Sequence, residues 1–228
     1  MKKLVFILFA ATSTLANAQD HKLVPQISVA GEGKVKVAPD FAIITVGVEN
    51  SGADATEVKK KNDMAIDAVI KFLKKSKIAE ADYQTQRVSL NKNYDYDKKK
   101  YNYSASQTIA ITLKDLKGYD VLMTGLVDSG INNIQGVEFK STKLAQYESE
   151  ARVKAVADAK LKANDYATAL GQRVGKAVLV SDNTQPYYPR PMMSAMKMNA
   201  GSADMAPETL AIGEIEITSN VSISFMLE

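Results

Sequence analysis

The residue types that most enzymes use for nucleophilic or acid-base chemistry are almost missing from this chain. Cysteine is absent from the 228 residues, and His21 is the only histidine. A thiol nucleophile and a zinc site built from Cys and His are therefore excluded, and His21 lies too near the N terminus to act as a base deep in a pocket. The 26 acidic residues do not exclude catalysis by a pair of carboxylates, so a carboxylate-dependent hydrolase is one alternative. We expect no catalysis and no cofactor.

Methionine gathers in one segment, residues 182–209, whose Pro, Gly, Ser and Asn content predicts a long loop or insertion. Thioethers are soft ligands for Cu(I), so a cluster of methionines is a candidate metal site. The same side chains could scavenge oxidants as sulfoxides, contact a membrane or partner, or simply pack against the domain as part of a linker. The candidate ligands are Met192, Met193, Met196 and Met198, with Met205 nearby.

Four tyrosines, Tyr94, Tyr96, Tyr101 and Tyr103, flank a predicted turn at residues 95–100. Aromatic side chains beside lysines can stack on bases or sugars. Without Lys2 and Lys3 the chain has 27 basic and 26 acidic side chains, and this balance argues against a nucleic-acid partner. Cross-strand tyrosine pairs commonly stabilise a hairpin, and tyrosine is enriched at protein interfaces. The sequence therefore predicts a structural hairpin and a candidate protein interface.

The first residues have the pattern of a secretory signal peptide. Lys2 and Lys3 precede an apolar stretch, and Ala16-Asn17-Ala18 forms an A-x-A cleavage site. The apolar stretch is shorter than the roughly 20 residues that span a bilayer. We expect residues 1–18 to be removed, leaving residues 19–228 as a single domain in the periplasm, with no transmembrane span and with association at the outer membrane left open.

Alternating and helical hydrophobic patterns predict the order of strands and helices along the rest of the chain. Residues 27–37 alternate, and Gly31-Glu32-Gly33 within them indicates a close backbone approach or a bulge rather than a phosphate-binding loop. Asp54 and Glu57 have the spacing of a capping box and begin a helix that runs to about Ser76. From residue 41 to residue 140 the predicted order is a split βαββαβ arrangement, as in ferredoxin-like domains. Its further elements are strands 85–94, 101–113 and 133–140 and a helix at 116–129.

The last third of the chain predicts a long helix at 142–170, a short buried strand at 178–180 and a closing strand at 214–227. Alanine recurs every fourth residue from Ala151 to Ala167, so we expect this helix to approach a sheet or a helix closely. The closing strand exceeds the usual strand length and is expected to cross the sheet, bend or project toward a neighbour. Ile223 and Phe225 are its candidate interface residues, and a closed homo-oligomer is expected.

Five stretches in this order resemble the SIMPL-domain family, the YggE-like bacterial periplasmic and outer-membrane immunogenic proteins. They are residues 27–49, 103–116, 129–139, the Ala-rich 151–171 and the closing 213–227. The resemblance implies an α+β fold with long N- and C-terminal antiparallel strands. It also implies an exported, non-enzymatic, oligomer-forming protein associated with envelope and oxidative-stress defence. It carries no catalytic motif to positions of this sequence.

From the sequence we therefore predict an oligomeric binding or scaffold protein of the cell envelope, with an envelope protein as a further candidate partner. A Cu(I)-binding or oxidant-scavenging protein that uses the Met-rich segment is the main alternative. Peripheral contact with a membrane is left open.

Overall fold

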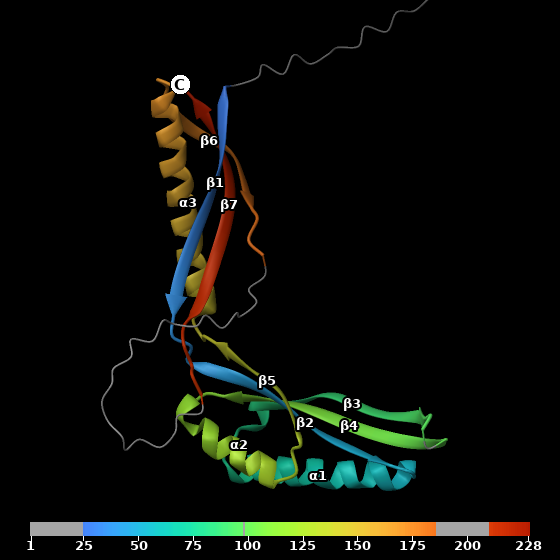
Figure 1. The fold of residues 1–228 in the computed structure, drawn as a ribbon. Coiled ribbons are helices and arrows are strands. Elements are labelled where there is room, and N and C mark those ends of the chain that lie inside the picture. Colours follow the sequence, from blue (N-terminus) through green and yellow to red (C-terminus); the bar gives the residue numbers. More distant parts are fainter. Residues whose placement is uncertain (1–24, 98, 186–209) are drawn as a thin grey trace, which may run out of the picture.

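The computed structural model describes residues 25–97, 99–185 and 210–228, which form an α+β fold of two layered units (Figure 1). The four-stranded unit contains β2 (Phe41–Gly52), β3 (Tyr83–Asp95), β4 (Lys100–Leu113) and β5 (Asn133–Lys140) with two α-helices. The second unit, named here the α3 unit, contains β1 (Gln26–Val37), β6 (Val174–Asp182), β7 (Ile215–Leu227) and α3 (Leu144–Ala169). The α+β class predicted from the sequence is confirmed. Whether both units behave as the single domain expected from residues 19–228 stays a prediction.

The four-stranded sheet has the order β3-β4-β2-β5, with every neighbouring pair antiparallel. Helix α1 (Ala55–Lys75) connects β2 to β3, and α2 (Tyr119–Asp128) connects β4 to β5. Each helix thus joins two parallel strands that have one antiparallel strand between them. The two 3-10 turns at Glu80–Asp82 and Leu116–Gly118 precede β3 and α2.

Local signals explain where the helices of this unit begin and end. The Asp54 side chain accepts the N–H of Glu57 at 2.9 Å, so the predicted N-cap is confirmed. Gly130 follows α2 with a φ of +111°, a conformation that side chains with a Cβ rarely adopt. Both helices cover the same face of the sheet, as Figure 1 shows. Large aliphatic side chains fill the space between the layers, among them Ile44, Val69, Leu73, Ile109, Ile111 and Leu126.

The α3 unit has β7 as its central strand, between β1 and β6. Strands β1 and β7 pair over the whole length of β1, from Gln26 opposite Met226 to Val37 opposite Ile215. Helix α3 packs on one face of β1 and β7 and touches β6 little. Gly171, at a φ of +69°, follows the helix and stops it where the sequence predicted.

Small residues let α3 lie directly on the backbone of β1. The five alanines that recur every fourth residue are all 0–1% exposed. A Cβ atom added at Gly31 would overlap the carbonyl oxygen of Ala155, and one added at Gly33 would overlap that of Ala151. The close approach predicted from the alanine repeat and from Gly31-Glu32-Gly33 is therefore confirmed, and these two features form one contact.

Hydrogen bonds to Asp40 link the two chain segments that connect the units. It lies between β1 and β2, and its carboxylate accepts the Thr142 N–H at 2.8 Å and the Thr142 hydroxyl at 2.6 Å. Thr142 lies between β5 and α3, so this contact joins segments about one hundred residues apart in sequence. The Thr142 hydroxyl is the main cause that holds the pKa of Asp40 below its ordinary value.

The structure contradicts one expectation about the last strands and narrows another. The predicted buried strand at 178–180 is the outer strand β6, and Val178, Leu179 and Val180 are 50–60% exposed because α3 covers the other two strands instead. Of the three alternatives for the closing strand, projection toward a neighbour is not realised, since β1 pairs with β7 from Ile215 to Met226. Strand length alone therefore gave no overhang for a neighbouring subunit.

Candidate interaction site at the strand edges

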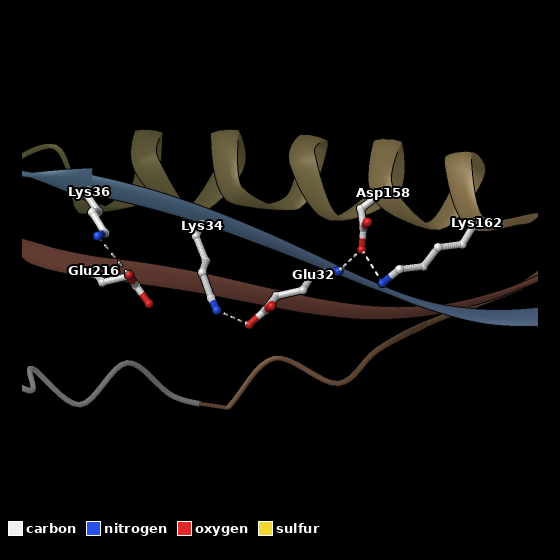
Figure 2. Close-up of polar contacts among 6 residues, drawn as sticks. All are labelled: Glu32, Lys34, Lys36, Asp158, Lys162 and Glu216. Carbon is white, nitrogen blue, oxygen red and sulfur yellow. Dashed lines mark hydrogen bonds and ion pairs between the residues drawn. The ribbon is translucent and has the colours of Figure 1, made fainter. Parts of the chain in front are cut away.

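Side chains of α3 close the outer edge of β1, and Figure 2 shows one of these contacts, between Asp158 and the backbone of Glu32. Asp158 accepts the N–H of Glu32 at 2.8 Å, and the Lys162 ammonium donates to the carbonyl of Ala30 at 3.1 Å. Lys154 donates to the carbonyl of Lys34 at 3.1 Å. These three side chains lie four residues apart, each directly before an alanine of the buried stripe. They occupy backbone groups that an exposed edge strand would offer to another strand.

The same side chains also bind one another. Lys162 and Asp158 form an ion pair at 2.7 Å. The hydrogen bond from Lys162, followed by that from the Glu32 N–H, holds the pKa of Asp158 below its ordinary value. Asp158 is therefore ionised at neutral pH, which is the state in which it accepts both bonds.

The face of the three-stranded sheet away from α3 carries exposed ion pairs. Lys34 binds Glu32 at 2.7 Å, and Lys36 lies 3.9 Å from Glu216 of β7. The hydrogen bond to Glu32 raises the pKa of Lys34. Figure 2 shows these pairs along β1 beside the contact with Asp158. Glu32, Lys34 and Lys36 are roughly half exposed and Glu216 is 20% exposed, so solvent screens these ion pairs.

Asn132 closes a second strand edge. Asn132 directly precedes the first residue of β5, and its amide accepts the N–H of Glu49 at 2.8 Å and donates to the carbonyl of Glu49 at 2.7 Å. The Asn133 amide also donates to the Glu49 carboxylate at 2.9 Å. The pair of bonds at Glu49 imitates a paired strand, so this part of β2 is not available for strand addition.

The tyrosine hairpin forms the end of the four-stranded unit away from the α3 unit (Figure 1). Tyr94 lies opposite Tyr101 in the register, with ring centroids 5.0 Å apart, and Tyr96 packs edge-on against Tyr94 at 5.1 Å. The Lys92 ammonium lies 4.0 Å from the centroid of the Tyr101 ring. Three tyrosines therefore stabilise one another across the hairpin, while Tyr103 lies opposite Lys92. Tyr96 is 83% exposed and Tyr101 is 55% exposed, so part of the aromatic surface of the hairpin faces solvent.

The other candidate residues have different locations. Ile223 and Phe225 are 2% and 3% exposed beneath α3, so they belong to the core of the chain itself and the basis for assigning them to an interface is lost. Met192, Met193, Met196 and Met198 lie outside the described residues, as does the predicted signal peptide at 1–18. Sequence reasoning missed the closed edge of β1. The repeat of Lys154, Asp158 and Lys162 beside the alanines was the available signal.

Within residues 25–97, 99–185 and 210–228, no group of three or more His, Cys, Asp or Glu side chains could hold a metal ion. In the same ranges no helix has the length and apolar character needed to cross a membrane.

Comparison with known proteins gives the family. The model of SIMPL, described as a protein of unknown function (DUF541), matches residues 27–225. The chain belongs to the SIMPL family. The match begins in β1 and ends in β7, so it includes both units.

Curated relatives of this SIMPL protein extend over nearly the whole chain. The uncharacterized protein YggE of Escherichia coli K12 is 28% identical over 224 residues, which cover 97% of this chain and 91% of the relative. The 26 kDa periplasmic immunogenic protein of Brucella melitensis is 28% identical over 234 residues, with 97% and 93% covered. YggE of Edwardsiella ictaluri is 27% identical over 218 residues, with 89% and 87% covered. The family predicted from the ordered stretches is confirmed.

Proposed function

We propose that this SIMPL protein is an exported protein of the cell envelope that acts by binding and assembly rather than by catalysis. The observation that carries the proposal is that side chains close some strand edges and leave others exposed. Side chains close the edge of β1 and part of β2, whereas β3 and β6 expose apolar side chains at outer strands. Edge strands are natural sites of pairing with other chains, so selective closure is what an interaction protein requires.

Two further observations support export and a non-catalytic role. Residues 1–18 have the composition of a signal peptide, and the Brucella melitensis relative is named a periplasmic protein. The described ion pairs of the β1 edge and sheet face are exposed rather than gathered in a closed pocket. A role in oxidative or envelope stress protection follows from the family resemblance.

Expression with the natural N terminus tests export and assembly separately. Protein recovered from the periplasmic fraction is expected to begin at Gln19, and an intact Met1 in that fraction would contradict export. Light scattering at micromolar concentration is expected to give a mass at least twice that of one mature chain. A single-chain mass over the whole concentration range would contradict assembly while leaving export untouched.

Cu(I) binding or oxidant scavenging by the Met-rich segment is the second candidate function. Five of the nine methionines of the chain lie between residues 182 and 209, and this composition alone supports the proposal. Replacement of Met192, Met193, Met196 and Met198 by Leu keeps side-chain volume and removes the sulfur ligands. If Cu(I) affinity is unchanged by these replacements, the metal proposal fails.

Peroxide titration tests the scavenging version, with methionines of the described residues as internal references. Met64 is 58% exposed, so it reports the reactivity of an ordinary surface methionine, whereas Met123 is 9% exposed and is protected by burial. Oxidation of the four segment methionines clearly ahead of Met64 is expected if they scavenge. Oxidation at the same rate as Met64 would contradict a specialised role.

A further inference from the structure

Strand β3 is an outer strand whose backbone edge is open in the described part of the chain. It runs for 13 residues from Tyr83 to Asp95, and β4 pairs with one side of it only. Among the described residues, no helix side chain is hydrogen-bonded to the outer backbone of residues 87–94, in contrast to the edge of β1. The register shift between Thr85 and Arg87 precedes this stretch, so residues 87–95 pair regularly with β4. A long, regular and open edge is the form of strand that pairs most readily with another chain.

One face of β3 carries exposed apolar side chains. Val88 is 68% exposed, Leu90 is 46% exposed and Tyr94 is 41% exposed, and alternation places all three on the same face. Lys92 lies on this face between Leu90 and Tyr94, with its ammonium 4.0 Å from the centroid of the Tyr101 ring. Helix α1 packs on β2 and β4 and touches β3 little, so this stripe lies beyond the helix layer. The opposite face carries Arg87, Ser89, Asn91 and Asn93. A partner strand at this edge would therefore cover apolar surface as well as bond the backbone.

We infer that β3 pairs antiparallel with β3 of a second copy of this chain, with the two Asn91 residues opposite each other. In this register Val88 lies opposite Tyr94 of the second copy, and Arg87 lies opposite Asp95 of the second copy. The two-fold axis repeats both contacts, one apolar and one between opposite charges. The Asp95 carboxylate also accepts the Asp97 N–H at 3.1 Å, which positions it at the end of the strand.

Charge selects this register over its neighbours. Side chains on both strands must share a face, so the centre can move only to another residue of β3. With Lys92 at the centre, two lysines would lie opposite each other and repel. With Leu90 at the centre, Arg87 would lie opposite Asn93 and lose its carboxylate partner. The register centred on Asn91 places each Lys92 opposite Leu90 rather than opposite the other lysine, and it keeps Arg87 opposite Asp95. It also joins the two sheets with their helices on one face.

This inference rests on the proposed assembly and names the surface that forms it. Disulfide trapping tests the register directly, because the natural chain has no cysteine. Residues directly opposite in an antiparallel pair have Cα atoms about 4.5–5.5 Å apart, within the range a disulfide requires. Asn91→Cys is therefore expected to give a covalent dimer under mild oxidation. Ser89→Cys is the matched control, since Ser89 lies opposite Asn93 of the second copy and should stay uncrosslinked.

A charge exchange tests the same contact without a covalent bond. Arg87→Asp places two carboxylates together and is expected to weaken association about tenfold. Addition of Asp95→Arg restores opposite charges and should return the affinity to within about threefold of the natural chain. Leu179→Lys on the exposed edge strand β6 is the control and should leave this association unchanged.

The outcomes separate the inference from the proposal on which it rests. A natural chain that stays monomeric by light scattering would overturn both. An oligomer whose mass is unchanged by Arg87→Asp, and in which Asn91→Cys and Ser89→Cys crosslink equally, would overturn the β3 contact and leave assembly in place. Crosslinking confined to Asn91→Cys, with rescue by the charge exchange, establishes the register.

Discussion

In each unit, helices pack against one face of an antiparallel sheet, but α3 lies closer to its strands than α1 does to its own. In the α3 unit, alanines face Gly31 and Gly33, and a Cβ atom added at Gly31 would lie 2.8 Å from the Cβ of Ala159. In the four-stranded unit, Val69, Leu73 and other large side chains separate α1 from β2 and β4. The distance between layers follows from the volume of the side chains between them.

This difference in distance has a consequence for the strand edges. Because α3 lies close to β1, side chains of ordinary length from its flank reach around to the backbone of the outer strand. Helix α1 lies over the middle of its sheet, and β3 has no such neighbour among the described elements. A closely packed helix can therefore close an edge strand, whereas a helix held away by large side chains leaves that edge open for pairing.

The contact between α3 and β1 is where a substitution should have the largest effect. Gly33→Ala is expected to lower the free energy of unfolding by about 3 kcal/mol, because its Cβ would displace the backbone of α3. Gly136→Ala on β5 is the control, since no atom lies within 4 Å of its Cβ, and it should change stability by less than about 0.5 kcal/mol. Urea denaturation measures both. Equal effects would contradict the close approach of the helix.

The stability of the four-stranded unit should depend instead on hydrogen bonds made by buried polar groups among its large apolar side chains. Asn62 is 3% exposed and donates to the carbonyls of Val48 at 2.9 Å and Ala105 at 3.4 Å. Asn62→Leu leaves these buried acceptors without that donor and should cost about 1–3 kcal/mol. Asn164→Leu changes the same residue type on the exposed surface of α3 and serves as the control. A smaller loss of unfolding free energy for Asn62→Leu than for Asn164→Leu would show that the Asn62 amide is dispensable.

Removal of the side chains that close β1 should change association more than stability. The combined variant Lys154→Ala, Asp158→Ala and Lys162→Ala is expected to lose little stability, because the bonds are exposed and screened by solvent. The opened edge should then pair between molecules, so the mass should rise with concentration beyond that of the natural chain. Lys160→Ala on the outer face of α3 controls for loss of surface charge. An unchanged mass would show that these side chains do not guard the edge.

Acid should weaken the same contacts slightly. The folded-state pKa values of Asp158 and Asp40 are lowered, so their contribution to stability is complete above the unfolded pKa of about 3.9 and is lost as the pH falls through the folded pKa. The melting temperature should therefore be less sensitive to pH below about 4 in Asp158→Asn than in the natural chain. Parallel profiles for the two proteins would contradict a native interaction of the ionised Asp158.

Local sequence signals predicted most elements well because helix caps and hydrophobic periods involve residues a few positions apart. The helix that begins after Asp54, the end of α2 before Gly130 and the strand at 133–140 all agree with the structure. The tyrosine pairing was also predictable, since a short turn fixes which residues of a hairpin lie opposite each other. The Met-rich segment stays a prediction, because it lies outside the described residues.

What the sequence by itself determined is therefore the set of elements, the family and the small-residue surface of α3. Only the tertiary structure decided which strands are central and which are edges. That decision depends on pairing between residues far apart in sequence, such as Ser28 and Ser224, whose hydroxyls lie 2.7 Å apart across β1 and β7. An alternating pattern reports that a strand has a buried face, but it is the same for a central strand and for an edge. For this reason the pattern left open whether β7 crosses its sheet, bends or projects, and it predicted a buried strand at β6, whereas the long-range pairing placed β7 at the centre and β6 at the edge.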